Sequence, residues 1–183
     1  MKNKKITLYN VMFPLWLLPF IGVFLGSLNG VLLTLIVVVS NFIVDTLVYY
    51  IAALTHSREN INENYKKCIL KIWLFGFLAD IIGVIPMFAV NFLAEIQMET
   101  TAKQWLLKNF INAVAFNPFE SIISFVWVVL CVLISMYFIY LFNYKISFKK
   151  LEIEQEKKKK MALILAIATA PYMFLVPSTF LYS

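Results

Sequence analysis

The chain carries little charge for its length. Only 14% of its 183 residues are Asp, Glu, Lys or Arg, whereas 62% are hydrophobic, and the mean hydropathy is +0.82. Charged residues make up about a quarter of an ordinary soluble domain. The low charge therefore excludes a soluble globular protein. It predicts a membrane protein with room for one compact helical bundle.

The residues that build metal and redox sites are also scarce. His56 is the only histidine, and the two cysteines, Cys68 and Cys131, have no partner at metal-ligand spacing. Zinc sites and histidine-based catalytic triads need several such residues. The sequence also has no P-loop, no dinucleotide-binding glycine motif, no H-E-x-x-H and no C-x-x-C. We therefore expect no metal, no cofactor and no enzymatic activity.

Long apolar runs alternate with polar segments along the chain. A transmembrane helix needs about 20 apolar residues. The runs predict an all-α, polytopic membrane bundle that forms one domain over residues 1–183, with spans at 8–25, 28–55, 68–94, 119–143 and 161–182. The first run contains Pro14 and Pro19, so it either spans the membrane or enters it as a broken, re-entrant helix. Because a second apolar run follows with no cleavage site between them, we expect the first to be retained.

Two of these runs carry an aspartate deep inside. Asp45 lies before Thr55 by about 15 Å of helix, and Asp80 lies after Cys68 by about 18 Å. The polar stretch 56–67 joins the two runs as a short loop, so both distances start from the same membrane face. The two acids are therefore expected at similar depth. An ionised carboxylate is costly there unless it faces protein or water, is paired, or takes up a proton.

Small and polar residues share a helix face with each acid. Asn41 precedes Asp45 by one turn, and Gly76 and Gly83 flank Asp80 at helical spacing. Asp45, Asp80 and Asn41 are therefore the candidate residues for handling an ion, a proton or a ligand. The same pair can instead hydrogen-bond neighbouring side chains and hold two helices together. Two membrane-embedded carboxyls sharing a proton are also what an intramembrane aspartyl protease needs, although the flanking residues match no protease motif.

The link from residue 95 to residue 117 contains an amphipathic segment. A helix over 101–116 would carry apolar side chains on one side and polar ones on the other: Trp105, Leu106, Leu107, Phe110, Ile111 and Val114 against Lys103, Gln104, Lys108, Asn109 and Asn112. This pattern predicts a helix lying on the external membrane surface. A cap packed over the bundle would show the same pattern, so both interpretations stay open.

Positive charges are concentrated in three segments. Fourteen of the sixteen Lys and Arg residues lie within 1–5, 56–71 and 144–160. With five spans these segments share one side, which the positive-inside rule makes cytoplasmic. We therefore predict a cytoplasmic N-terminus, a cytoplasmic basic loop over 144–160 and an external C-terminus. The lysines that end this loop are expected to contact anionic lipid head groups and not nucleic acid: Lys157, Lys158, Lys159 and Lys160.

These features favour a non-enzymatic protein of the plasma membrane. The preference for lysine over arginine, with abundant Ile, Phe and Asn, is typical of an AT-rich bacterial genome. We expect a small transport or channel component, or a subunit of a larger membrane complex, with Asp45 and Asp80 at its polar centre. Length and hydropathy also fit the substrate-binding membrane subunit of a vitamin importer. A structural scaffold and an intramembrane aspartyl protease are the alternatives. The expected partners are the lipid bilayer and either another membrane protein or further copies of this chain.

Overall fold

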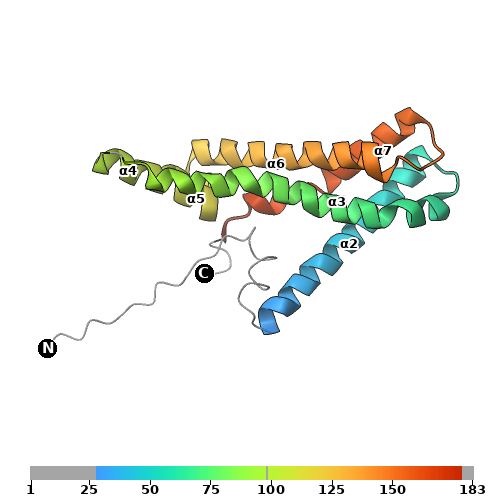
Figure 1. Cartoon of the computed structure of the whole chain (residues 1–183), viewed down its shortest axis with the longest axis horizontal. Helices are drawn as coiled ribbons and strands as arrows, with labels where there is room; N and C mark the ends of the chain where they lie inside the picture. The colour runs from blue at the N-terminus through green and yellow to red at the C-terminus, as the bar shows by residue number, and fades with distance from the viewer. Residues whose placement is uncertain (1–27, 98, 179–183) are drawn as a thin grey trace.

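The structure, a computed structural model, describes residues 28–97 and 99–178 (Figure 1). These residues are helical, with no strand among them. The α-helices are α2 (Leu28–His56), α3 (Ile61–Ala89), α4 (Thr100–Leu106), α5 (Asn112–Phe116), α6 (Ile122–Phe142) and α7 (Gln155–Ala168). Short 3-10 turns form η2 (Val90–Glu95), η4 (Pro118–Glu120) and η6 (Tyr172–Leu175), and π-helical turns form η3 (Leu107–Ile111) and η5 (Asn143–Ser147).

Three of the described helices are long and apolar enough to cross a membrane. They cover Thr34–His56, Ile61–Glu95 and Ile122–Ser147. These stretches overlap the runs 28–55, 68–94 and 119–143 in which the sequence predicts spans, so the all-helical, membrane-compatible architecture is confirmed. The predicted span at 8–25 lies outside the described residues.

The loop predicted at 56–67 is wrong in its extent. The turn between α2 and α3 occupies only Ser57–Asn60, and α3 already begins at Ile61. Asn60 takes a left-handed backbone conformation with φ 48°, which asparagine tolerates better than most residues. The residues that follow, Asn62 to Lys67, are polar but compatible with a helix. The change in hydropathy therefore marks the edge of the apolar run and not the end of the helix.

The predicted span at 161–182 is not one continuous helix in the residues that the structure describes. The helix α7 begins earlier, at Gln155, and ends at Ala168; the chain resumes as the turn η6 after Pro171. Proline has no backbone N–H and disfavours the helical conformation of the residue before it, so it ends α7 here. The side-chain hydroxyls of Thr169 and Tyr172 donate to the carbonyls of Leu165 (2.8 Å) and Ile167 (2.6 Å), near the end of the helix.

The bundle is built on the pair α3 and α6, which lie side by side with opposite chain directions (Figure 1). Glycine permits their close approach, because a Cβ atom at Gly83 would collide with the hydroxyl of Ser135 and lie 3.0 Å from the Cys131 carbonyl oxygen. The helix α7 packs on both α6 and α2, and its Ala162 and Ala166 are buried, as is Ala170 two residues after its end. The helix α2 meets this group at one end and diverges from it toward its own N-terminus.

The two halves of the segment 100–116 differ in how far their side chains are buried. Within the described residues α4 buries no side chain, and its Trp105 is 53% exposed. In the second half, Ile111, Ala113 and Val114 are buried, and the ring of Phe110 meets that of Trp127 on α6 at a centroid distance of 5.8 Å. The second half therefore packs as a cap on α6, whereas the first half, α4, has no buried side chain among the described residues.

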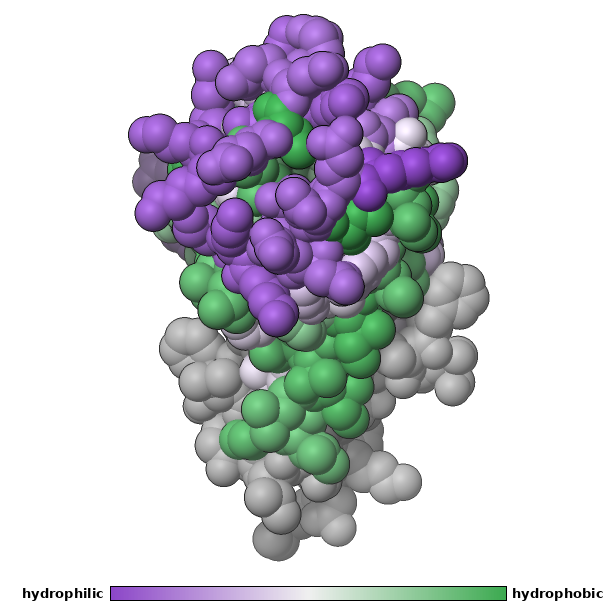
Figure 2. Space-filling model, turned by 90° about the vertical axis from the view of Figure 1, so that its right-hand side faces the viewer, coloured by the Kyte–Doolittle hydropathy of each residue, from purple (hydrophilic) through white to green (hydrophobic). Residues whose placement is uncertain are grey.

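Polar residues gather at the end of the bundle where α2 turns into α3. Figure 2 shows this end covered by hydrophilic side chains, with apolar surface along the sides of the helices. The short turn Ser57–Asn60 and the segment from Phe148 to Glu154 both lie at this end. Two of the three lysine-rich segments, 56–71 and 144–160, are thus brought to one end of the molecule. The third, residues 1–5, lies outside the described residues.

Candidate functional site

Asp45 and Asp80 are the only aspartates in the chain, and they lie on neighbouring helices. Asp45 is on α2, and its side chain is 3% exposed. Its carboxyl faces α3 at Gly76, where a Cβ atom would lie 3.7 Å from Asp45 Oδ2. This contact needs a small residue at position 76. Because Gly76 lies one helical turn from Asp80 on α3, the Asp45 carboxyl lies within about one turn of Asp80.

Asp80 has a half-buried side chain with one inaccessible oxygen. Its Oδ1 is shielded from solvent and has no hydrogen-bond partner among the described residues. The carboxyls of Asp80 and Asp45 are close enough to interact electrostatically. We call Asp45, Gly76 and Asp80 the acid centre. Because two like charges in an apolar region are costly, the acid centre must be stabilised by a proton, a cation or water.

Asn41 lies one turn before Asp45 on α2 and is half-buried. In the described part of the chain its side chain makes no hydrogen bond to either acid, so the structure places it beside the acid centre and not within it. Trp73 lies nearer to the diverging half of α2. Its Nε1 donates to the Val38 carbonyl at 3.3 Å, and its ring meets that of Phe42 at 5.8 Å. These contacts attach the diverging half of α2 to α3.

A group of bonded hydroxyls lies between the acid centre and the polar end. Thr46 and Tyr65 share a hydrogen bond of 3.1 Å, Tyr49 donates to the Ile61 carbonyl at 3.3 Å, and Tyr50 donates to Asn62 at 3.2 Å. The rings of Tyr50 and Tyr65 stack at 5.1 Å. We call these four residues, Thr46, Tyr49, Tyr50 and Tyr65, the tyrosine layer. It joins α2 to α3 and closes this side of the acid centre toward the polar end.

Three buried polar residues of α6 and η5 do not appear among the sequence-based candidates. Ser135, Asn143 and Ser147 are each at most 1% exposed. The Ser135 and Ser147 hydroxyls and both polar atoms of the Asn143 amide have no hydrogen-bond partner among the described residues. Their spacing in the sequence, eight and then four residues, indicates that they share one helix face. Nothing in the sequence says that this face is the buried one.

The four lysines proposed to contact lipid differ in their surroundings. Lys157 pairs with Glu154 at 3.6 Å, and Lys159 pairs with Glu156 at 2.6 Å, each within one turn of α7. Lys158 is buried at 6% exposed, and Lys160 is exposed. The hydrogen bond from Lys159 lowers the pKa of the Glu156 carboxyl. Lys160 is therefore the one of the four that is both exposed and without an ion pair among the described residues.

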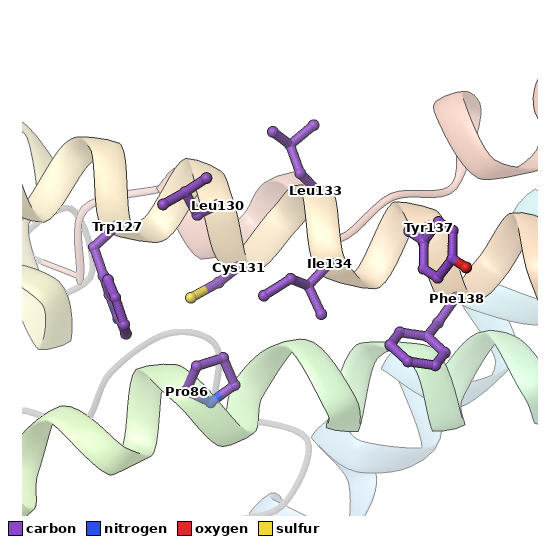
Figure 3. Close-up of a pocket in the computed structure, with 8 residues that line it drawn as sticks. All are labelled: Pro86, Trp127, Leu130, Cys131, Leu133, Ile134, Tyr137 and Phe138. Atoms are coloured by element: carbon purple, nitrogen blue, oxygen red, sulfur yellow. The ribbon is translucent and has the colours of Figure 1, made fainter.

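Two hollows in the described structure lie away from the acid centre. An apolar groove of about 370 Å³ runs between α3 and α6, where Trp127, Cys131 and Ile134 point toward Pro86 while Leu133 points away (Figure 3). Its remaining lining residues are Leu130, Tyr137 and Phe138. A polar hollow of about 260 Å³ at the polar end is lined by Glu59, Asn60, Glu63, Asn64, Lys67, Glu152 and Ile153. No group of His, Cys, Asp and Glu in the described residues has the arrangement of a metal site.

Comparison of the chain with protein-family models, with curated proteins and with solved structures gives no match. We therefore infer the function from the arrangement of the acid centre and its surroundings.

Proposed function

We propose that the chain is a multi-pass plasma-membrane protein that handles protons or cations at the acid centre, as a small transport component or as the ion-handling subunit of a membrane complex. A carboxyl held in an apolar region binds a proton or a cation more readily than it stays bare and ionised. The chain places its only two aspartates there, whereas all eight glutamates lie in polar segments or near the ends of the apolar runs.

The observation that carries this proposal is the unpartnered buried oxygen of Asp80. An acid that served to hold two helices together would donate to or accept from a neighbouring side chain or carbonyl. In the described residues Asp80 Oδ1 has no such partner. The acid centre has the chemistry of a binding site whose occupant is not another side chain.

The proposed topology has five spans, with the N-terminus in the cytoplasm and the C-terminus outside. The residues from Lys157 to Ser178 support a further crossing, because Ala166 packs with Ala79 midway along α3 while Phe174 packs with Val114 at the capped end. This crossing is helical in its first half and irregular in its second. Irregular backbone is tolerated at membrane depth when other helices cover it, and Phe174 is buried. Residues 8–25 would supply the remaining span.

We also propose that α4, the uncovered first half of the segment 100–116, lies on the external membrane surface. Its apolar side chains, including the exposed Trp105, would rest in the interfacial region of the bilayer. Reporter fusions test the orientation. A reporter after Tyr65 or Glu154 should be cytoplasmic, and one after Thr100 should be external. Finding Thr100 and Glu154 on one side would overturn the five-span topology.

Transport is tested with the full chain reconstituted into lipid vesicles. Proton and sodium flux would be measured under an imposed potential for the wild type, Asp45→Asn, Asp80→Asn and the double variant. Each Asn variant keeps the side-chain size and removes the charge, so each single substitution should abolish the flux while the protein still folds. The double variant should be no worse than the worse single one, because the two acids act as one unit. Glu63→Gln, an exposed glutamate outside the centre, is the matched control.

Unchanged flux in all three Asn variants would overturn the proposal and leave a structural role for the two acids. A protease is distinguished by a different observation. It would need the two carboxyls to share one proton, and no hydrogen bond joins them in the part of the chain that the structure describes. Cleavage of a membrane-spanning peptide by the wild type, lost in both Asn variants, would favour the protease instead.

A further inference from the structure

A row of buried polar groups leads along α6 and η5 toward the level of the acid centre. Ser147 and Asn143 are each 1% exposed and lie one turn apart at the end of this helix. The Asn143 amide can make up to four hydrogen bonds and the Ser147 hydroxyl up to three. In the described residues neither side chain makes any. Buried polar groups in folded proteins almost always have a partner, which can be protein or water.

The contacts between helices fix the height of this row. On the facing surfaces of α3 and α6, Gly83 meets Ser135, Ala79 packs with Ile139, and the rings of Phe75 and Phe142 meet at 5.4 Å. A step of three or four residues toward the polar end on α6 is thus matched by a step of four residues on α3. Asn143, next to Phe142, therefore lies at the level of Gly76, where the Asp45 carboxyl also lies. Ser147 lies one turn closer to the polar end.

The polar end of the row is marked by a lysine. Ile139 of α6 and Ala166 of α7 pack in the same cluster, and these two helices run in opposite directions. Lys158 lies eight residues before Ala166, and Ser147 lies eight residues after Ile139. The side chains of Lys158 and Ser147 therefore lie at the same level. Lys158 is 6% exposed and forms neither of the ion pairs of α7. The row thus runs from a charged residue at the polar end, through Ser147 and Asn143, to the acid centre.

The backbone at this point is also unusual. Asn143–Ser147 is a π-helical turn at the end of the apolar α6. Such turns are rare, and they occur frequently at functional sites. The wider turn changes the direction of the side chains that follow, and here it accompanies the burial of two polar side chains on one face. Apolar residues at both positions would have packed this face without leaving polar groups unbonded.

We propose that Asn143, Ser147 and Asp80 Oδ1 bind a file of water molecules that connects the acid centre to the cytoplasmic end of the bundle. This inference rests on the proposed function. It specifies that the ion is a proton and that its route is the file of water molecules. A hydronium ion at the cytoplasmic end passes its proton along the file by successive O–H bond formation and cleavage. The last water protonates the carboxylate of Asp80, giving a neutral acid, and the reverse sequence releases the proton. The tyrosine layer, whose hydroxyls are already bonded, takes no part.

Cysteine accessibility tests the file directly. In full-length protein with Cys68→Ala and Cys131→Ala, single cysteines are placed in the row by Asn143→Cys and Ser147→Cys. The matched controls are Ile72→Cys and Ala52→Cys, which are equally buried in the apolar core near the same end. Inside-out vesicles are exposed to silver ion, which is small enough to follow a row of single waters and reacts with thiols. The remaining free thiols are counted with a fluorescent maleimide after unfolding.

The two cysteines in the row should react at least about tenfold faster than the two controls, because thiol reactivity requires access to water. Equal rates for all four would show a dry row and overturn the proposal. Ser147→Cys changes only oxygen to sulfur, so it keeps the test valid if Asn143→Cys fails to fold. A second measurement follows the deuteration of the protonated carboxyl by infrared spectroscopy in D₂O. This exchange should slow in Ser147→Val, and an unchanged rate would also contradict the file.

The outcome is independent of the transport assay. A reactive row together with normal flux in the Asn variants of the acids would confirm the water and overturn the proposed function. An unreactive row together with lost flux would overturn the file, and the acid centre would then take up its ion by another route.

Discussion

The tyrosine layer and the acid centre lie next to each other on the same two helices. The polar groups of the tyrosine layer are hydrogen-bonded within the protein, whereas a buried carboxyl oxygen of the acid centre is not. In the tyrosine layer, Thr46 bonds to Tyr65, and the hydroxyls of Tyr49 and Tyr50 reach Ile61 and Asn62. One turn deeper, the carboxyl of Asp45 faces Gly76, which has no side chain to bond it, and Asp80 Oδ1 has no partner in the described structure. The two regions share their helices, so the difference lies in the side chains.

The comparison separates polar residues that stabilise the bundle from polar residues that are available to a ligand. A hydroxyl that is bonded across two helices contributes to their association, by about 0.6 to 2 kcal/mol in membrane proteins. A buried carboxyl without a partner costs free energy, and a proton, a cation or water that binds it offsets this cost. Substitutions that remove the polar groups should therefore lower the free energy of unfolding in the tyrosine layer and leave it unchanged or raise it in the acid centre.

The largest effect is expected in the tyrosine layer. Tyr49 is among the most deeply buried large side chains, at 1% exposed, and it packs against Ala52, Cys68 and Ile72. Tyr49→Ala should lower the free energy of unfolding in detergent micelles by about 3 kcal/mol or more, as large aromatic deletions do. Tyr49→Phe is the control and should lose only the hydrogen bond. A loss below about 1 kcal/mol for Tyr49→Ala would show that the tyrosine layer does not hold α2 to α3.

The next effect distinguishes the two glycines of α3. A methyl group at Gly83 would collide with the Ser135 hydroxyl, so Gly83→Ala should cost about 1–3 kcal/mol of stability. Adding Ser135→Gly should recover most of the loss. At Gly76 a Cβ would make ordinary contact with Asp45 Oδ2 at 3.7 Å, so Gly76→Ala should change stability by less than about 1 kcal/mol. Equal losses at the two positions would contradict the described packing.

The smallest effect is expected on the exposed side of α7. The hydrogen bond from Lys159 lowers the pKa of Glu156, so the pair contributes only while this carboxyl is ionised and is lost as the pH falls through its folded-state pKa. Both groups lie at the protein surface, and ion pairs of this kind contribute little. The thermal midpoints of the wild type and Glu156→Gln should therefore agree within error at neutral pH and at acid pH. A clear, pH-dependent gap would mean that the pair is covered in the folded protein.

Much of the fold follows from the sequence because hydropathy and helix geometry act over long runs. The three described helices that are long and apolar enough to cross a membrane correspond to predicted runs. The depth of the two acids could be estimated because Asp45 and Asp80 are counted from the same short connection. The four-residue spacing of Ala162 and Ala166 places them on one face of α7, and both are buried.

The rest depends on tertiary packing. The polar start of α3, Asn62 to Lys67, resembles a loop because hydropathy cannot separate a solvated helix from a turn. The break after Ala168 depends on Pro171, whose effect on a predicted membrane helix is set by the helices that cover it. The burial of Asn143 and Ser147 could not be predicted, because a polar residue on an apolar helix is informative only once the buried face of the helix is known. That face is defined by contacts with α3, which is distant in the sequence, and with α7.

The stability of Asp80→Leu tests most directly whether the acid centre binds a ligand or holds the helices together. Leucine removes both the charge and every hydrogen bond that the carboxyl could make. Because Asp80 Oδ1 has no partner in the described residues, the free energy of unfolding in detergent micelles should stay the same or rise. A loss of about 1 kcal/mol or more, the value of a broken interhelical hydrogen bond, would contradict this account and make Asp80 a structural residue.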